Sequence, residues 1–176
     1  MNHPQAASVR ERVSAGEWEA RVNLAACYRF AAYFRMTDLI YTHISARVPG
    51  PEHHFLLNAF GLMWDEVTAS NLVKITLDGD IVDDPTGLGF NQAGFVIHSA
   101  IHAARPEINC VMHTHTTAGV AVASLQGGLS QSNFYSAQLH QLVAYHEFEG
   151  ITETADEGER IAKELADKPV LSCISA

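Results

Sequence analysis

Basic residues are scarce in this chain of 176 residues. Eleven lysines and arginines stand against twenty aspartates and glutamates, so the formal net charge is -9, and no run of lysine or arginine occurs. Such a chain repels nucleic acids and anionic membranes, except at a local basic patch. The sequence therefore predicts neither a nucleic acid nor a membrane as a partner.

Long apolar runs are also missing. No apolar stretch approaches the roughly 20 residues of a membrane-spanning helix, and the first residues lack the basic-then-apolar pattern of a secretion signal. We expect a cytoplasmic protein on these grounds. The cysteines, Cys27, Cys110 and Cys173, are odd in number and lie in apolar surroundings. This predicts reduced core thiols rather than a disulfide or a cysteine-based metal site.

Internal repeats and low-complexity segments are absent as well, and the composition is that of a globular domain. With 47% hydrophobic and 18% charged residues, the length suits one domain with a real core. Residues 1–14 carry no strong period and are expected to form a flexible arm or a short helix. Residues 15–176 are expected to form the domain.

The expected elements alternate between helix and strand, which is typical of an α/β domain. Turn signals at residues 49–51 and 78–79 predict hairpins, and hence a mixed, largely antiparallel sheet. Helices are expected from residue 17 to before 37, and over 64–72, 92–104, 117–124, 134–144 and from the capping box at 154–157 to 167. Strands are expected over 40–48, 54–58, 108–115, in the hairpin 73–82, and from residue 170.

The expected strand 40–48 has an unusual face. Ile44, Ala46 and Val48 alternate with His43, Ser45, Arg47 and, before them, Tyr41, so one face is apolar and the other polar. The polar face either looks into a pocket or is an ordinary solvent face.

A glycine-containing loop follows the next strand. Asn58-Ala59-Phe60-Gly61 breaks the strand, and the glycine allows a backbone to approach a ligand closely. The alternative is that Gly61 only makes a turn.

Two pairs of histidines stand out. If residues 108–115 are extended, His113 and His115 share a face and make half a metal site, or they are surface or hydrogen-bonded groups. His98 and His102 lie one turn apart on the expected helix 92–104. No His-Glu-x-x-His pattern accompanies them, so we interpret them as packing or hydrogen-bonding residues.

Several segments together resemble the class II aldolase and adducin-head family. The order of Gly94-Phe95-Val96-Ile97-His98, Ala104-Arg105-Pro106 and His113-Thr114-His115-Thr116 is similar to that family's helix, turn and strand. The other matching segments are Thr42-His43-Ile44-Ser45-Ala46-Arg47, Leu57-Asn58-Ala59-Phe60-Gly61-Leu62-Met63-Trp64 and Tyr145-His146-Glu147-Phe148-Glu149-Gly150. The resemblance covers residues 18–170.

This resemblance implies a fold, an assembly and a cofactor. It implies a three-layer α/β/α domain with helices on both faces of the sheet, in a homotetramer with active sites between subunits. It also implies a divalent metal, usually zinc, held by three histidines, of which His113 and His115 match two. The metal would stabilise the enolate of a small hydroxy or keto acid. His43, Asn58 and Gly61 would then bind the substrate in the same pocket.

Three departures from the family pattern weigh against a sugar-phosphate aldolase. The family's third histidine, in an Asn-His-Gly stretch after the strand beginning at Val170, has no counterpart before Ala176. The position of the family's catalytic glutamate is Gly94, and its two phosphate-holding serines correspond to Gln92 and Ala93. The chain thus resembles the adducin-like branch, apparently truncated at its C-terminus.

Two classes of function remain open. The first is a metal-dependent carbon–carbon lyase that cleaves or decarboxylates a small hydroxy or keto acid. The second is a non-catalytic, adducin-like or truncated assembly module. The His113 and His115 pair favours the first, and Gly94 with the missing third ligand favours the second. His140 and His146 are the nearest histidines in sequence that could complete a metal site.

Overall fold

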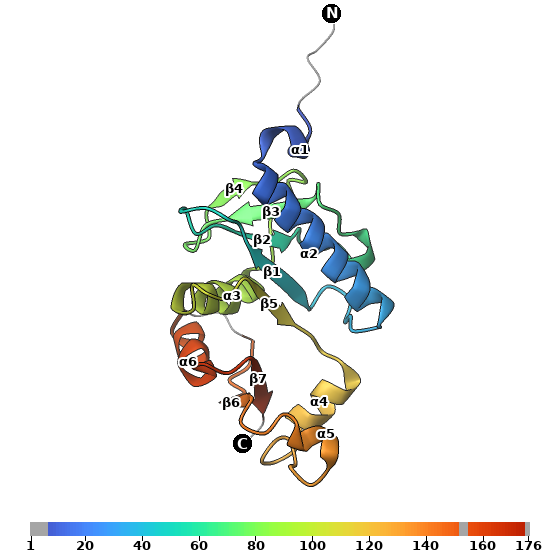
Figure 1. Cartoon of the computed structure of the whole chain (residues 1–176), viewed down its shortest axis with the longest axis vertical. Helices are drawn as coiled ribbons and strands as arrows, with labels where there is room; N and C mark the ends of the chain where they lie inside the picture. Colours follow the sequence, from blue (N-terminus) through green and yellow to red (C-terminus); the bar gives the residue numbers. More distant parts are fainter. Residues whose placement is uncertain (1–6, 152–154, 175–176) are drawn as a thin grey trace, which may run out of the picture.

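The computed structural model describes residues 7–151 and 155–174. Figure 1 shows its elements in chain order. They are α1 (Val9–Arg12), α2 (Ala15–Tyr33), β1 (His43–Arg47), β2 (Phe55–Asn58), the 3-10 helix η1 (Trp64–Glu66), β3 (Leu72–Ile75), β4 (Ile81–Asp83), α3 (Gln92–Ala104), β5 (Cys110–His113), α4 (Thr117–Ala123), α5 (Phe134–Ala137), β6 (Val143–Glu147), α6 (Ala155–Leu165) and β7 (Val170–Ile174).

The central sheet has five strands in the order β4-β3-β2-β1-β5, and each neighbouring pair is antiparallel. A second sheet contains β6 and β7, which run parallel. The expected mixed, largely antiparallel sheet is confirmed. The hairpin expected at 73–82 is β3 and β4, which are joined through Asp78-Gly79.

The two faces of the central sheet are covered by different helices. Ile44 and Leu56 pack with Leu24 and Tyr28 of α2, whereas Phe55 and its strand-mates pack with Phe95 of α3. Since side chains alternate along a strand, α2 and α3 lie on opposite faces. The α/β/α layering that the resemblance implies is therefore present.

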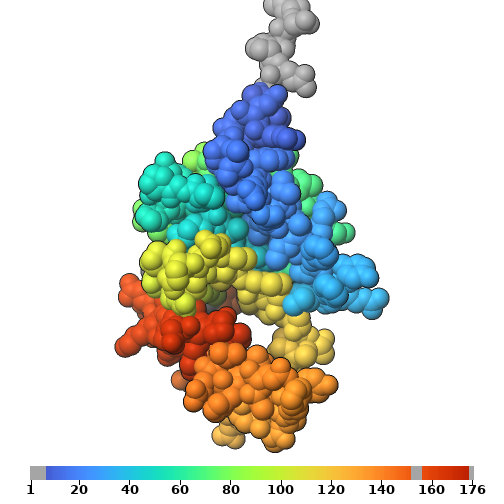
Figure 2. Space-filling model, viewed as in Figure 1, coloured from blue at the N-terminus to red at the C-terminus, as the bar shows by residue number. Residues whose placement is uncertain are grey.

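The C-terminal part of the chain is attached mainly through α6. Ile161 and Leu165 of α6 form a buried cluster with Ile101 of α3, as the sequence predicted for these two α6 side chains. In Figure 2 an open hollow separates α6 from the segment that joins β5 to α4. This hollow lies beside the segment that follows β5.

Some expected elements are shorter than the sequence indicated. The strand expected from residue 40 begins at His43, and Tyr41 is exposed. The helix expected over 64–72 is the single turn η1, and β3 already begins at Leu72. The helix expected over 134–144 ends at Ala137, and the chain turns through Gln141, whose φ is 63°, before Val143 begins β6.

Other expectations concern burial. The apolar pattern of residues 92–104 predicts that Ile97, Ala100, Ile101 and Ala104 face inward. Of these only Ile101 is buried, and His98 and His102 are buried as well. All three cysteines are free, as expected, although Cys110 and Cys173 are exposed rather than in the core. The expected capping box at Thr154 lies outside the described residues. None of the helices within the described ranges is long and apolar enough to cross a bilayer.

Candidate functional site

The two histidines that end the β5 segment point at one another. His113 is the last residue of β5 and His115 follows it, outside the strand. Their Nε2 atoms are 3.0 Å apart, and their rings meet edge to face with centroids 4.6 Å apart. Two nitrogens this close can share one cation, because each metal–nitrogen bond to zinc is about 2.0–2.1 Å.

Asp38 orients His115 from the far side of its ring. Nδ1 of His115 donates to Oδ2 of Asp38 at 2.8 Å, which leaves Nε2 free to act as an acceptor. Histidines that bind metals typically donate their other ring N–H to a carboxylate in this way. No sequence pattern relates Asp38 to His115, 77 positions later, so this partner was not predicted.

The pair fits two ligands of a metal site. Nδ1 of His113 is buried and has no hydrogen-bond partner in the described part of the chain. Across residues 7–151 and 155–174, no group of three or more His, Cys, Asp or Glu side chains is arranged to hold a metal ion. His113 and His115 thus offer two nitrogens that could bind a metal, and no third His, Cys, Asp or Glu of the described residues is arranged with them for this.

His43 lies next to this pair on the neighbouring strand. It is the direct partner of His113 in the antiparallel ladder of β1 and β5, and the two rings have centroids 5.0 Å apart. An antiparallel partner lies on the same face of the sheet. His43 therefore lies on the same face of the sheet as His113, and its substrate-binding role stays a prediction.

Gly94 is shaped to receive His43. A Cβ atom at Gly94 would lie 2.3 Å from Nε2 of His43, far inside van der Waals contact. Any other residue at this position would therefore displace the imidazole. At this position, which matches the family's glutamate, the ring of His43 occupies the space that a side chain would need.

A chain of buried hydrogen bonds runs away from His43. Nδ1 of His43 is 2.9 Å from Nε2 of His98, and Nδ1 of His98 is 2.6 Å from Oγ of Ser45. Ser45 Oγ is 2.8 Å from Nε2 of His102, whose Nδ1 lies 3.3 Å from Nη2 of Arg47. The polar face of β1 is therefore not a solvent face, and His98 and His102 are hydrogen-bonding residues as predicted.

Burial keeps these imidazoles neutral. Loss of water, followed by the nearby His113 and His115, lowers the pKa of His43 to about 3. Burial also lowers the pKa of His98 well below its ordinary value, and burial with His115 lowers that of His113 to about 4. Neutral imidazole is the form that binds a metal, since a protonated nitrogen has no free lone pair.

Asn58 does not join this cluster, and that part of the prediction is wrong. Its Oδ1 accepts a hydrogen bond from the hydroxyl of Tyr28 at 2.8 Å, and Tyr28 belongs to α2. Asn58 therefore lies on the face opposite His43 and His113, because it is two residues from Leu56, which packs against the same helix. Gly61 has a φ of 82° and open space around its Cα, so its substrate-binding role stays a prediction.

The two other candidate histidines lie elsewhere. His146 is on β6, and its Nδ1 donates to Oε2 of Glu164 at 2.7 Å. His140 lies in the turn region between α5 and β6 and is exposed. Neither belongs to a three-ligand group with His113 and His115.

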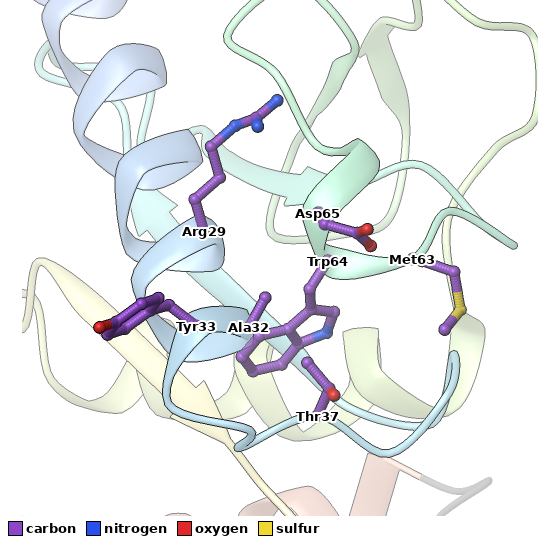
Figure 3. A pocket seen from close by; sticks show the side chains of 7 residues that line it. All are labelled: Arg29, Ala32, Tyr33, Thr37, Met63, Trp64 and Asp65. Carbon is purple, nitrogen blue, oxygen red and sulfur yellow. The ribbon is translucent and has the colours of Figure 1, made fainter.

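A cavity of about 440 Å³ opens between the end of α2 and η1, on the α2 side of the sheet. Figure 3 shows Arg29 and Asp65 at its mouth and the indole of Trp64 at its base. Trp64 is fixed there because its Nε1 donates to the carbonyl of Thr42 at 2.9 Å. None of the histidines described above lines this cavity.

Comparison with known proteins identifies related chains. The family model described as "Class II Aldolase and Adducin N-terminal domain" matches residues 22–174. The crystal structure of an aldolase II superfamily protein from Pseudomonas syringae superimposes with a TM-score of 0.92 and 59% identity, over 95% of this chain and 67% of that one. L-fuculose 1-phosphate aldolase from Glaciozyma antarctica gives a TM-score of 0.78 at 29% identity, over 99% and 67% of the two chains.

The related proteins include chains named as aldolases and chains named as adducins. A Caulobacter vibrioides protein named "Putative aldolase class 2 protein" is 48% identical over 93% of this chain, which spans 63% of that relative's length. Alpha-adducin from Rattus norvegicus is 49% identical over 87% of this chain and 21% of its own length. Sequence identity alone therefore does not separate the aldolase-like relatives from the adducins.

Proposed function

Since the chain belongs to the class II aldolase and adducin N-terminal domain family, we propose that it is the metal-binding part of a lyase. The lyase would cleave or decarboxylate a small hydroxy or keto acid. The observation that supports this most directly is the convergence of His113 and His115, with Nε2 atoms 3.0 Å apart and Asp38 behind His115. A homotetramer, a cytoplasmic location and zinc as the metal belong to the same proposal.

A divalent metal at this position would supply Lewis acidity toward the oxygens of the substrate. The protein's own contribution is to keep His113 neutral through burial and to aim the rings of His113 and His115 at one point. Asp38 holds the ring of His115 by a 2.8 Å hydrogen bond, and β5 fixes His113 opposite His43. His43 and Gly61 would bind the substrate beside the pair.

The second candidate function is a non-catalytic assembly module related to the adducin head. Gly94 favours it, because glycine cannot transfer a proton where the family resemblance places a glutamate. The 49% identity to alpha-adducin and the lack of a third ligand among the described residues favour it as well. Under this alternative the histidines would be a structural remnant with no affinity for metal.

Calorimetric titration with zinc near neutral pH separates the two candidates. We expect weak binding that disappears in the double variant His113→Ala with His115→Ala. Extending the chain after Ala176 with an Asn-His-Gly continuation should tighten zinc binding by about 10-fold or more, since even outer-shell changes alter affinity by about 10- to 100-fold.

A matched control for this titration is His140→Ala, which removes an exposed histidine outside the pair. The control should bind zinc like the parent chain. Zinc binding that survives the loss of both His113 and His115, or that is equal in the parent and the extended chain, would contradict the proposed site.

A further inference from the structure

The hydrogen-bond chain behind His43 has only two possible directions. Ser45 lies between Nδ1 of His98 and Nε2 of His102, at 2.6 and 2.8 Å, and its hydroxyl carries one proton. It therefore donates to one histidine and must accept from the other. Because a neutral imidazole has one N–H and one acceptor nitrogen, the choice at Ser45 sets the tautomer of every ring in the chain.

Arg47 selects the direction. Its guanidinium has donors only, and Nη2 lies 3.3 Å from Nδ1 of His102. Nη2 also donates to the carbonyl oxygens of His102 at 2.7 Å and Arg105 at 3.4 Å. A hydrogen on Nδ1 of His102 would face both this N–H group and its positive charge. Nδ1 is consequently an acceptor, and the hydrogen of His102 is on Nε2.

The carbonyl oxygen of Ile108 acts in the opposite sense, since its proximity raises the pKa of His102. That oxygen also accepts Nε–H of Arg47 at 3.2 Å, and its second lone pair could accept from the ring. The charge of Arg47, however, acts on the ring of His102 more strongly than the carbonyl of Ile108 does. We therefore infer that Nδ1, which lies next to Arg47, carries no hydrogen.

The remaining steps follow from one donor per group. Nε2–H of His102 donates to Ser45, whose hydroxyl donates to Nδ1 of His98. Nε2–H of His98 then donates to Nδ1 of His43 at 2.9 Å. Nδ1 of His43 is thereby an acceptor, and the hydrogen of the neutral His43 ring must be on Nε2.

We propose that His43 presents a fixed Nε2–H donor to a substrate oxygen beside His113 and His115, and that Arg47, Ser45, His98 and His102 position it. This inference rests on the proposed function. Within the described residues no hydrogen bond occupies Nε2 of His43. In this tautomer His43 is neither a third metal ligand nor a base. It would stabilise the oxygen that gains negative charge when a carbon–carbon bond breaks.

Gly94 leaves space for the His43 ring itself, because a Cβ at this position would lie 2.3 Å from Nε2. The ring itself is held on three sides, by His98 at its Nδ1, by His113 beside it and by α3 across Gly94. A donor fixed in this way does not need to reorient as charge develops, which is the basis of electrostatic stabilisation in enzyme sites.

Nitrogen-15 NMR of histidine-labelled protein at pH 7 tests the tautomer directly. We expect the His43 signals of an Nε2–H tautomer, assigned by their loss in His43→Phe, and the same tautomer for His98 and His102. The variant Ser45→Ala should remove this preference at His98, because the relay is broken there. An Nδ1–H tautomer at His43, or no change at His98 in Ser45→Ala, would overturn the proposal.

The second readout is binding of glycolate, a small hydroxy acid, to the zinc-loaded protein. His43→Phe keeps a ring but loses the donor, so glycolate should bind about 10-fold more weakly, as expected for the loss of a hydrogen bond of about 1.4 kcal/mol to a charged group. Zinc affinity should be retained. Unchanged glycolate affinity, or loss of zinc binding, would overturn the role of His43. If wild-type protein binds no zinc, the proposed function fails, and the NMR experiment still decides the tautomer.

Discussion

At the scale of single residues, the close approach of Gly94 to His43 gives a direct prediction. Gly94→Ala puts a Cβ 2.3 Å from Nε2 of His43, so the ring or α3 must shift. We expect a loss of about 1–3 kcal/mol in the free energy of unfolding, as for other overpacked sites, measured by urea denaturation.

Gly16→Ala is the matched control, since it also lies in a helix but its Cβ would meet Pro49 at an ordinary 3.7 Å. The control should be neutral or stabilising, because alanine favours a helix over glycine by about 0.5–1 kcal/mol. In a His43→Ala background the penalty of Gly94→Ala should disappear. Equal effects of the two glycine substitutions would refute the contact.

His102 should make the stability of the protein depend on pH. Burial, then the charge of Arg47, lowers its pKa to about 4 from the ordinary 6.5. Between these values the unfolded chain binds more protons than the folded one, so stability falls as the pH drops from 6.5 to 4. In His102→Gln the free energy of unfolding should change less steeply with pH, by up to about 1.4 kcal/mol per pH unit. Unfolding curves at several pH values for both proteins measure this, and parallel dependences would contradict it.

Residue types at the candidate site could be predicted, but their arrangement only in part. His113, His115 and His43 were identified because a strand places alternate side chains on one face. The burial of His98 was not foreseen, since the inward face of α3 was assigned from its apolar residues. That helix packs on the sheet with one side and on α6 with another, and sequence periodicity assigned one inward face only.

At the scale of elements, local signals gave the best predictions. The bounds of α3 agree with the expected 92–104, because Asn91 caps its start by accepting from Gly94 and Arg105-Pro106 follows its end. The predictions failed for segments whose secondary structure depends on a strand that is far away in the sequence. Val143–Glu147 is a strand because it pairs with β7, 27 positions further along in the register Val143 to Val170, and nothing in the segment itself marks that partner.

A buried ion-pair network ties α2 to the sheet. Arg21 is fully buried, and it donates to Glu17 at 2.9 Å, to the carbonyl of Leu72 at 2.9 Å and to Asp83 at 3.2 Å. Arg21→Met leaves Glu17 buried with one partner fewer, although Lys74 still contacts it at 2.8 Å. We expect a loss of about 3–5 kcal/mol in the free energy of unfolding, measured by urea denaturation.

Arg29→Met provides the comparison on the same helix, because Arg29 is exposed at the mouth of the cavity. Its effect should stay within about 0.5 kcal/mol. Similar losses for Arg21→Met and Arg29→Met would show that the network does not anchor α2.

At the scale of the whole molecule, several large apolar side chains of the C-terminal part are exposed. Phe134 and Tyr135 of α5 are 75% and 80% exposed, and Phe148 and Ile151 after β6 are 61% and 79% exposed. Large exposed apolar side chains of this kind can mark an interaction site or an aggregation liability. The β6–β7 pair adds strand edges that are unpaired within the described residues.

We therefore predict that the isolated chain self-associates through this surface. Sedimentation velocity over a wide range of concentrations should show species larger than a monomer. The double variant Phe134→Glu with Tyr135→Lys should shift the distribution toward monomer, because charge opposes burial of the patch. Tyr33→Lys is the matched control, since Tyr33 is also 80% exposed but belongs to α2, and it should leave the distribution unchanged. A chain that stays monomeric at high concentration and binds no hydrophobic dye would contradict the prediction, whereas a shift caused by Tyr33→Lys alone would move the contact surface to α2.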